Sequence, residues 1–110
     1  MDCIFCKIIN NEVPAKKIFE SEDVLVIENI KPEAPFHALA IPKKHFILEE
    51  TNELSLSDLS QTMYEAIKVA DKILPGGYRL ISNVGPDSNR EIDHAHIHIV
   101  GGKNLGGILP

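Results

Sequence analysis

The stretch His94-Ala95-His96-Ile97-His98-Ile99-Val100 places three of the chain's five histidines at every second position. Consecutive side chains of a β-strand point to opposite faces, so these three imidazoles share one face of an extended strand. Ala95, Ile97 and Ile99 then occupy the other face, where alternating apolar residues can pack against a core. The stretch therefore predicts a strand with one apolar face and one face of histidines that belongs to a reaction site.

The segments around this strand predict a small α+β domain. Further strands are expected at Lys17 to Glu20, Val24 to Ile27, His37 to Ile41 and Tyr78 to Val84. A short N-terminal helix is expected to run through Ile8 and Ile9. Because most links between strands are short, we expect a five-stranded, mainly antiparallel sheet in a single domain over residues 1–110.

One long helix is predicted from about Leu56 to Leu74. Apolar residues recur there at helical spacing along one stripe, formed by Leu56, Leu59, Met63, Ala66, Ile67, Ala70, Ile73 and Leu74. The segment Ser55-Leu56-Ser57-Asp58 resembles a capping box at the start of the helix. Pro75-Gly76-Gly77 ends it, since proline lacks a donor and glycine permits a left-handed turn.

The composition is that of a globular chain, with 44% hydrophobic and 25% charged residues. Sixteen acidic and eleven basic residues leave a formal charge of −5, and no run of Lys or Arg is long enough to follow a phosphate backbone. No apolar run approaches the roughly 18 residues of a membrane span, and no signal segment is visible. We therefore expect a cytoplasmic protein that binds neither nucleic acid nor membranes.

The spacing of the histidines favours separate roles over one shared metal. At about 3.3 Å per residue, the Cα atoms of His94 and His98 lie about 13 Å apart, too far to ligate one ion readily. A neutral imidazole is nucleophilic at pH 7 and can attack phosphorus to form a covalent intermediate. The central ring, His96, is the predicted nucleophile. His98 can stabilise charge on phosphoryl oxygens, and backbone carbonyls can set the tautomer of His96.

The histidine stretch resembles the His-φ-His-φ-His-φ-φ signature of the histidine triad superfamily of nucleotide hydrolases and transferases. Gly101-Gly102 after it also fits the pattern. The likeness extends to residues 3–9, 35–45 and 77–85, so it covers nearly the whole chain. The branch that the chain most resembles is that of the Hint-like nucleoside phosphoramidases.

This resemblance implies hydrolysis of a nucleoside 5′-phosphoramidate or a related mixed phosphate. The AMP-type purine nucleotide would pass to His96 and then to water, with His98, His37 and His94 as the other catalytic residues. The nucleotide-binding residues that it implies are Asn29, Asn83, Arg90, Glu91, Phe5, Ile8, Ile27 and Ile30. For the four apolar residues, an ordinary core position is the alternative. The resemblance also implies a homodimer, which would cover an exposed sheet edge.

Three departures from the family pattern bear on the substrate. Asn29 stands where the family has an aspartate that holds the ribose hydroxyls, and an amide can hydrogen-bond to a hydroxyl without supplying charge. Arg90 replaces a glutamine, and Ser88-Asn89 replace glycine-rich residues, so the family's leaving-group preference is not carried over to this chain. The segment from Leu105 to Pro110 lacks the tryptophan-containing tail of the animal enzymes.

The pair Cys3-Ile4-Phe5-Cys6 brings two thiols close together. Zinc is tetrahedral, so two imidazoles would complete its ligands, and His45 and His94 are the candidates. Resemblance to zinc-containing members of the superfamily implies a structural site of these four residues. An inert pair of small apolar residues is the alternative. A redox pair is disfavoured because no strand precedes the cysteines.

Two other functions are compatible with the same residues. A nucleotide-binding or partner-binding protein could keep the same pocket without significant catalysis, and the altered Asn29 and Arg90 favour it. Alternatively, His94, His96 and one of His37 or His45 could form a catalytic zinc site that activates water.

Overall fold

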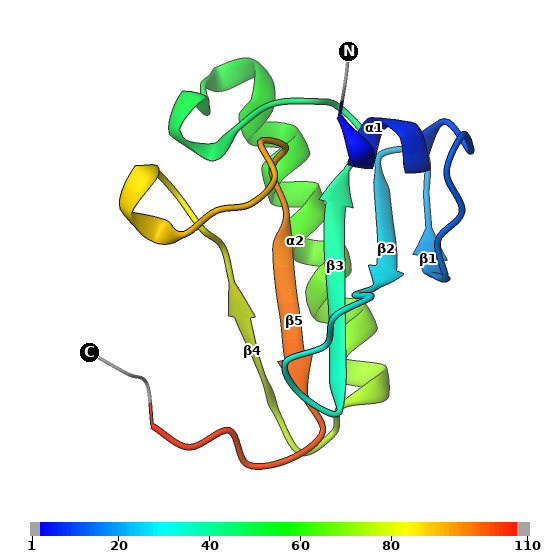
Figure 1. Ribbon diagram of the computed structural model, residues 1–110, viewed down its shortest axis with the longest axis vertical. Coiled ribbons are helices and arrows are strands. Elements are labelled where there is room, and N and C mark those ends of the chain that lie inside the picture. Colours follow the sequence, from blue (N-terminus) through cyan, green and yellow to red (C-terminus); the bar gives the residue numbers. More distant parts are fainter. Residues whose placement is uncertain (1–2, 108–110) are drawn as a thin grey trace.

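A five-stranded antiparallel sheet organises residues 3–107, the part of the chain that the computed structural model describes (Figure 1). The strands are β1 (Lys17–Glu20), β2 (Val24–Glu28), β3 (Phe36–Pro42), β4 (Tyr78–Ile81) and β5 (Ile97–Gly101), in the order β1-β2-β3-β5-β4. The helices are α1 (Ile4–Ile9) and α2 (Glu53–Ile73), with 3₁₀ turns η1 (Leu48–Glu50) and η2 (Pro86–Ser88). The α+β fold with one long and one short helix is confirmed. The predicted domain limits, 1 and 110, lie outside the described residues.

Side-chain alternation divides the sheet into two different faces. Ala38 lies opposite Ile99 across the β3–β5 pair, whereas Leu39 lies opposite His98. Opposed residues point to the same face. The first face packs against α2, and its buried cluster contains Val24, Val26, Ala38, Ala40, Ile97 and Ile99 with Ala66, Val69, Ala70 and Leu74 of the helix region. The second face packs against α1 through Leu25, Ile27, Leu39 and Ile41. The histidines share this second face.

Helix α2 begins three residues earlier than the sequence predicts. Its N-cap is Asn52, whose Oδ1 accepts hydrogen bonds from the backbone of Leu54 at 2.9 Å and Ser55 at 3.2 Å. Ser55 Oγ in turn accepts from Asn52 N at 2.9 Å, which completes a capping box. The predicted box at Ser55 was therefore misplaced. The first turn of the helix is mostly polar or exposed, so apolar periodicity could not reveal it.

The buried side of α2 also differs from the predicted stripe. Leu56, Met63, Ile67 and Ile73 are 53%, 40%, 38% and 43% exposed, whereas Ser55, Thr62 and Glu65 are buried. The reason lies in β3, whose residues on the face toward α2 are Ala38 and Ala40. Small residues of the helix, including Ala66 and Ala70, can approach that surface closely. The larger side chains are consequently left on the outer side of the helix.

The histidine strand is shorter than predicted, because β5 begins at Ile97 and the first two histidines precede it. The last β3–β5 pair is Ala40 with Ile97, and β3 ends at Pro42, which has no N–H for a further ladder bond. One backbone bond, from Ala95 N to Phe46 O at 2.7 Å, holds the preceding segment. Likewise, β4 ends at Ile81, short of Val84.

Candidate active site and metal cluster

His96 has one ring nitrogen bound and the other available. Its Nδ1–H donates to the backbone carbonyl of His94 at 2.7 Å, because a carbonyl can only accept. The neutral ring therefore carries its lone pair on Nε2, which forms no hydrogen bond within residues 3–107. Burial lowers the pKa of His96, and the positive charge of Arg90 adds to this effect. At neutral pH the ring is uncharged and its Nε2 can act as a nucleophile.

A second chain of hydrogen bonds orients His98. The backbone N–H of Glu33 donates to Nδ1 of His37 at 2.9 Å, so neutral His37 carries its proton on Nε2. That Nε2–H donates to Nδ1 of His98 at 2.8 Å. Neutral His98 must then carry its own proton on Nε2. The His98 ring centroid lies 5.1 Å from that of His96, so a donor stands beside the nucleophile.

Asn29 lies beside this chain. Its Oδ1 accepts a hydrogen bond from the backbone of Lys31 at 2.8 Å, which orients the amide. Its Nδ2 is then 3.3 Å from Nε2 of His37. Because that nitrogen already donates to His98, the two donors face each other and the contact is a poor hydrogen bond. The Asn29 amide N–H groups are thus better used by a ligand than by His37.

Two carboxylates that no sequence pattern singled out, those of Glu49 and Asp93, hold the guanidinium of Arg90. Its guanidinium binds Glu49, and its Nε donates to Asp93 at 3.0 Å. Glu49 also accepts from the backbone of Gly85 at 3.2 Å. Arg90, Asn83 and His96 line one narrow hollow that is too small to admit a water molecule in this conformation. No sequence signal could pair Glu49 with Arg90, because they are 41 positions apart.

Asn83 is itself tied to the loop that carries Arg90. Its Nδ2 donates to the backbone carbonyl of Ser88 at 2.7 Å. Ser88 Oγ donates to the carbonyl of Gly85 at 2.7 Å. These bonds fix the conformation of residues 83–88, and Asn83 can present its remaining polar groups to a ligand.

The predicted nucleotide-binding residues Phe5, Ile8, Ile27, Ile30 and Glu91 do not lie together in the structure. Phe5, Ile8 and Ile27 are buried together on the histidine face. Ile30 is 92% exposed and lies outside that cluster, so it does not line a buried pocket here. Glu91 lines a cavity of about 520 Å³ with Cys3, Ile4, Lys7, His45, Ile92 and Asp93. The structure thus places Glu91 beside the cysteine pair, away from the hollow that contains His96.

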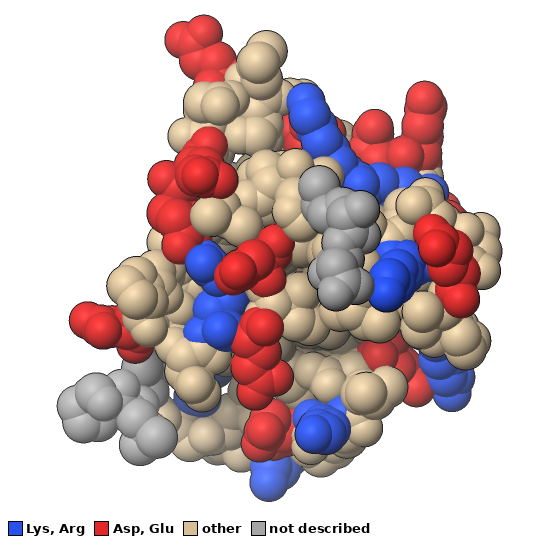
Figure 2. Space-filling model, turned by 45° about the horizontal axis from the view of Figure 1, so that its top comes forward, with Lys and Arg blue, Asp and Glu red and all other residues tan. Residues whose placement is uncertain are grey.

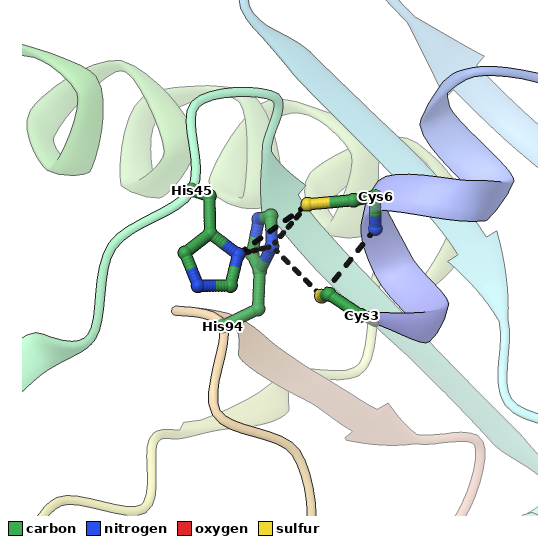
Figure 3. A group of neighbouring side chains, drawn as sticks. All are labelled: Cys3, Cys6, His45 and His94. Carbon is green, nitrogen blue, oxygen red and sulfur yellow. Dashed lines mark hydrogen bonds between the residues drawn. The ribbon is translucent and has the colours of Figure 1, made fainter. Parts of the chain in front are cut away.

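Cys3, Cys6, His45 and His94 converge from three separate segments (Figure 3). One ligand atom from each lies within 4.8 Å of the others. Nδ1 of His94 lies 3.5 Å from Cys3 Sγ, 3.6 Å from Cys6 Sγ and 3.1 Å from His45 Nδ1, while Cys6 Sγ lies 3.3 Å from His45 Nδ1. We call these four residues the metal cluster, since their ligand atoms could hold one metal ion.

The orientation of His94 suits a ligand. Its Nε2–H donates to the carbonyl of Pro42 at 2.7 Å, which leaves the lone pair on Nδ1 facing the cysteines. Burial, together with the neighbouring Cys3 sulfur, raises the pKa of the Cys6 thiol. Among the described residues, the ligand atoms of His94, His96 and His37 or His45 do not come together as a metal site, and His94 instead joins the two cysteines and His45.

Comparison with known proteins identifies the fold and its histidines. The sequence model of the HIT (histidine triad) domain matches residues 10–105. The chain belongs to the HIT family. An uncharacterized HIT-like protein of Azospirillum brasilense is 35% identical, over 96% of this chain and 90% of its own length. These matches place the histidine stretch within the family domain.

Solved structures of HIT proteins share the fold closely. A HIT family hydrolase from Clostridium thermocellum is 39% identical, with a TM-score of 0.92 over 99% of this chain and 97% of its own. A zinc-bound histidine triad family protein from Mycobacterium smegmatis is 29% identical, with a TM-score of 0.79 over 96% and 78% of the two chains. HIT relatives thus support a hydrolase-type enzyme in general terms.

On the face shown in Figure 2, Lys and Arg side chains are scattered among Asp and Glu and form no continuous basic surface. Within residues 3–107, no helix combines the length and the apolar character needed to cross a bilayer.

We expect the free energy of unfolding to fall as the pH drops from about 6.5 to about 4. Burial and the neighbouring His96 and His37 lower the pKa of His98 to about 4, whereas its ordinary value is 6.5. The unfolded chain therefore binds more protons in this window, and the contribution of His98, complete above pH 6.5, is lost toward pH 4. Before solvent screening this amounts to at most about 3 kcal/mol.

Urea unfolding at pH 7 and pH 4.5 would measure this effect. The matched variant is His98→Asn, which retains a polar side chain opposite His37 but has no group that titrates in the window. Its loss of stability on acidification should be smaller than that of the unmodified protein. Equal losses would show that other groups carry the pH dependence.

Proposed function

We propose that this HIT protein is a nucleotide hydrolase or transferase in which His96 forms a covalent nucleotidyl intermediate. The observation that carries the proposal is the state of the His96 ring, which is neutral, bound at Nδ1 by the His94 carbonyl and unengaged at Nε2. Nucleophilic catalysis needs such a lone pair, fixed in direction and free of a proton. The substrate class proposed is a purine nucleoside 5′-phosphoramidate or a related mixed phosphate of the AMP type.

The reaction proceeds in two displacements. In the first, Nε2 of His96 forms a bond to phosphorus while the bond from phosphorus to the leaving group breaks, and the electron pair departs with the leaving atom. An amine leaving group also takes up a proton, which a water molecule can supply. In the second, a water oxygen attacks phosphorus and the water gives up a proton to the solvent. The N–P bond breaks, and the lone pair returns to Nε2 as the nucleoside monophosphate is released.

The neighbouring residues bind the phosphoryl group, the ribose and the leaving group. His98, whose Nε2–H is left free by the bond from His37, donates to a phosphoryl oxygen and stabilises the charge that develops there. Asn29 offers amide N–H groups to the ribose hydroxyls. Asn83 and Arg90, which share the hollow with His96, contact the phosphate or the leaving group. His37 acts through His98 and is a positioning residue.

Intact-protein mass after brief exposure to an adenosine phosphoramidate would test the proposal. We expect a transient mass increase of one adenylyl group, mapped by peptide analysis to His96, together with release of AMP. Calorimetric AMP binding without an adduct or hydrolysis across a panel of phosphoramidates would instead identify a binding protein. An adduct on another side chain would remove His96 from the role.

We further propose that the metal cluster binds zinc in a structural role. In a tetrahedral zinc site, bond lengths of about 2.0 Å to nitrogen and 2.3 Å to sulfur give edges of about 3.3 Å between nitrogens and about 3.5 Å between nitrogen and sulfur. The cluster has 3.1 Å between its two nitrogens and 3.3–3.6 Å for three of its nitrogen–sulfur pairs, and all four ligand atoms lie within 4.8 Å of one another. Zinc would cross-link three segments of the chain. Thiolate ligands also suit the reducing cytoplasm, the location we propose.

A homodimer is proposed from the surface of α2 and β4. Leu56, Met63 and Ile67 form an exposed apolar row on the outer side of α2, and β4 is an edge strand of the sheet. A second copy would cover this row and the open strand edge together. Sedimentation should give a dimer for the unmodified chain and a monomer for Met63→Glu. Glu22→Lys, in the turn before β2, is the control and should remain dimeric.

A further inference from the structure

We propose that the metal cluster positions the nucleophile, because His96 rests on two groups that belong to the segments the cluster joins. This inference rests on the proposed role of His96. The first group is the carbonyl of His94, which accepts from His96 Nδ1 at 2.7 Å. The second is Phe5, whose ring meets the His96 ring edge-on with centroids 5.2 Å apart. A bound metal would thus hold the reactive ring as well as the fold.

His94 links the cluster to the nucleophile within one residue. Its ring contributes Nδ1 to the cluster and is held from the other side by Pro42 O at 2.7 Å. Its backbone carbonyl sets the tautomer of His96. A rotation of the His94 ring out of the cluster would be transmitted to that carbonyl, since both belong to a short segment outside the strand. The backbone of this segment is also held by the bond from Ala95 N to Phe46 O and by Ser82 Oγ, which donates to the carbonyl of His96 at 2.9 Å.

Helix α1 supplies the second link. Phe5 lies between Cys3 and Cys6, and its ring also contacts His94 with centroids 5.8 Å apart. The helix has six residues, and helices this short are not stable by themselves. Its position therefore depends on tertiary contacts, of which the two cysteines in the cluster are the most directional. Binding through Cys3 and Cys6 fixes the ring of Phe5 against His96.

Loss of this support would act on the tautomer of His96. If the His94 carbonyl moves away, Nδ1–H loses its acceptor, and the alternative ring with the proton on Nε2 becomes populated. That form has no lone pair toward phosphorus. A displacement of about 1 Å at a reacting group can reduce a rate about 100-fold. The expected signature is a lower kcat with nucleotide affinity largely preserved.

The experiment compares the zinc-loaded protein with the same protein depleted by a chelator, at a temperature where circular dichroism shows both to be folded. We expect kcat to fall about 10- to 100-fold on depletion, while the Kd for AMP changes less than about 3-fold. Imidazole ¹⁵N NMR should report one Nδ1–H tautomer of His96 when loaded and a mixture when depleted. Zinc addition should restore both. Unchanged kcat and an unchanged tautomer in the depleted, folded protein would overturn the proposal.

A pair of α1 variants separates positioning from folding. Phe5→Leu keeps all four ligands and should bind zinc normally, yet lower kcat about 10-fold by removing the ring that faces His96. Ile9→Leu, a half-buried position on the same helix, is the control and should retain kcat. If Phe5→Leu instead weakens AMP binding with kcat preserved, Phe5 contacts the nucleotide and its positioning role is wrong. If the loaded protein shows no turnover at all, the proposed function fails while the NMR comparison still tests the positioning.

Discussion

Replacement of His96 by alanine is expected to reduce turnover of an adenosine phosphoramidate at least about 1000-fold, because it removes the only atom that forms the bond to phosphorus. The ring is otherwise neutral and held by the His94 carbonyl, so no new charge is buried by the change. Binding of AMP should survive, since its other contacts remain. Steady-state kinetics together with calorimetric titration of AMP would measure both effects.

A second variant guards against simple misfolding. His96→Asn places an amide N–H close to the position of the ring Nδ1–H, so it can still donate to the carbonyl of His94, but it lacks an atom equivalent to Nε2. We expect it to melt near the unmodified protein and to be as inactive as His96→Ala. Substantial turnover by either variant, with the fold intact, would remove His96 as the nucleophile and point to direct attack by water.

Removal of bound metal is expected to lower the melting temperature by more than about 10 °C. The four ligands come from the N-terminal region, from the loop after β3 and from the segment before β5. One ion would therefore join His94 to Cys3 and Cys6, which lie 91 and 88 positions away in the sequence. Metal binding to a preformed site stabilises the folded state directly. A loss of only 2–3 kcal/mol already shifts a domain of this size by about 10 °C or more. Differential scanning calorimetry with and without chelator measures the shift.

The matched variant for this prediction is Cys6→Ser, which removes one thiolate and keeps nearly the same volume. It should bind less than one equivalent of zinc by elemental analysis and melt near the chelated protein, and chelator should not lower its melting temperature further. If elemental analysis shows that the metal has left the unmodified protein while its melting temperature is unchanged, the cluster has no structural role.

Local patterns predicted the sheet well and the helix less well. A strand appears in each of the four predicted segments, 17–20, 24–27, 37–41 and 78–84, although the last ends at Ile81, because such short apolar runs bounded by turns depend little on distant residues. The long helix was found, but its start and its buried side were not. Those depend on the Asn52 cap and on the small residues Ala38 and Ala40 in the sheet, which apolar periodicity does not report.

The site was predicted in part for the same reason. Alternation along the histidine stretch put His96 and His98 on one face and Ile97 and Ile99 on the other, and the structure agrees. The contact between Arg90 and Glu49, and the exposure of Ile30, could not be read from spacing. Long-range ion pairs and the burial of individual side chains depend on how distant segments pack together, and the spacing of residues along the sequence does not report that packing.

The sequence by itself therefore determined which side chains share a face, since two-residue alternation follows from the covalent geometry of an extended chain. It also determined where β3 stops, because Pro42 has no N–H to extend the ladder. Only the tertiary structure decided which nitrogen of His96 is free. That choice depends on the carbonyl of His94, on the ring of Phe5 and on a cluster drawn from three distant segments, whose meeting is set by packing.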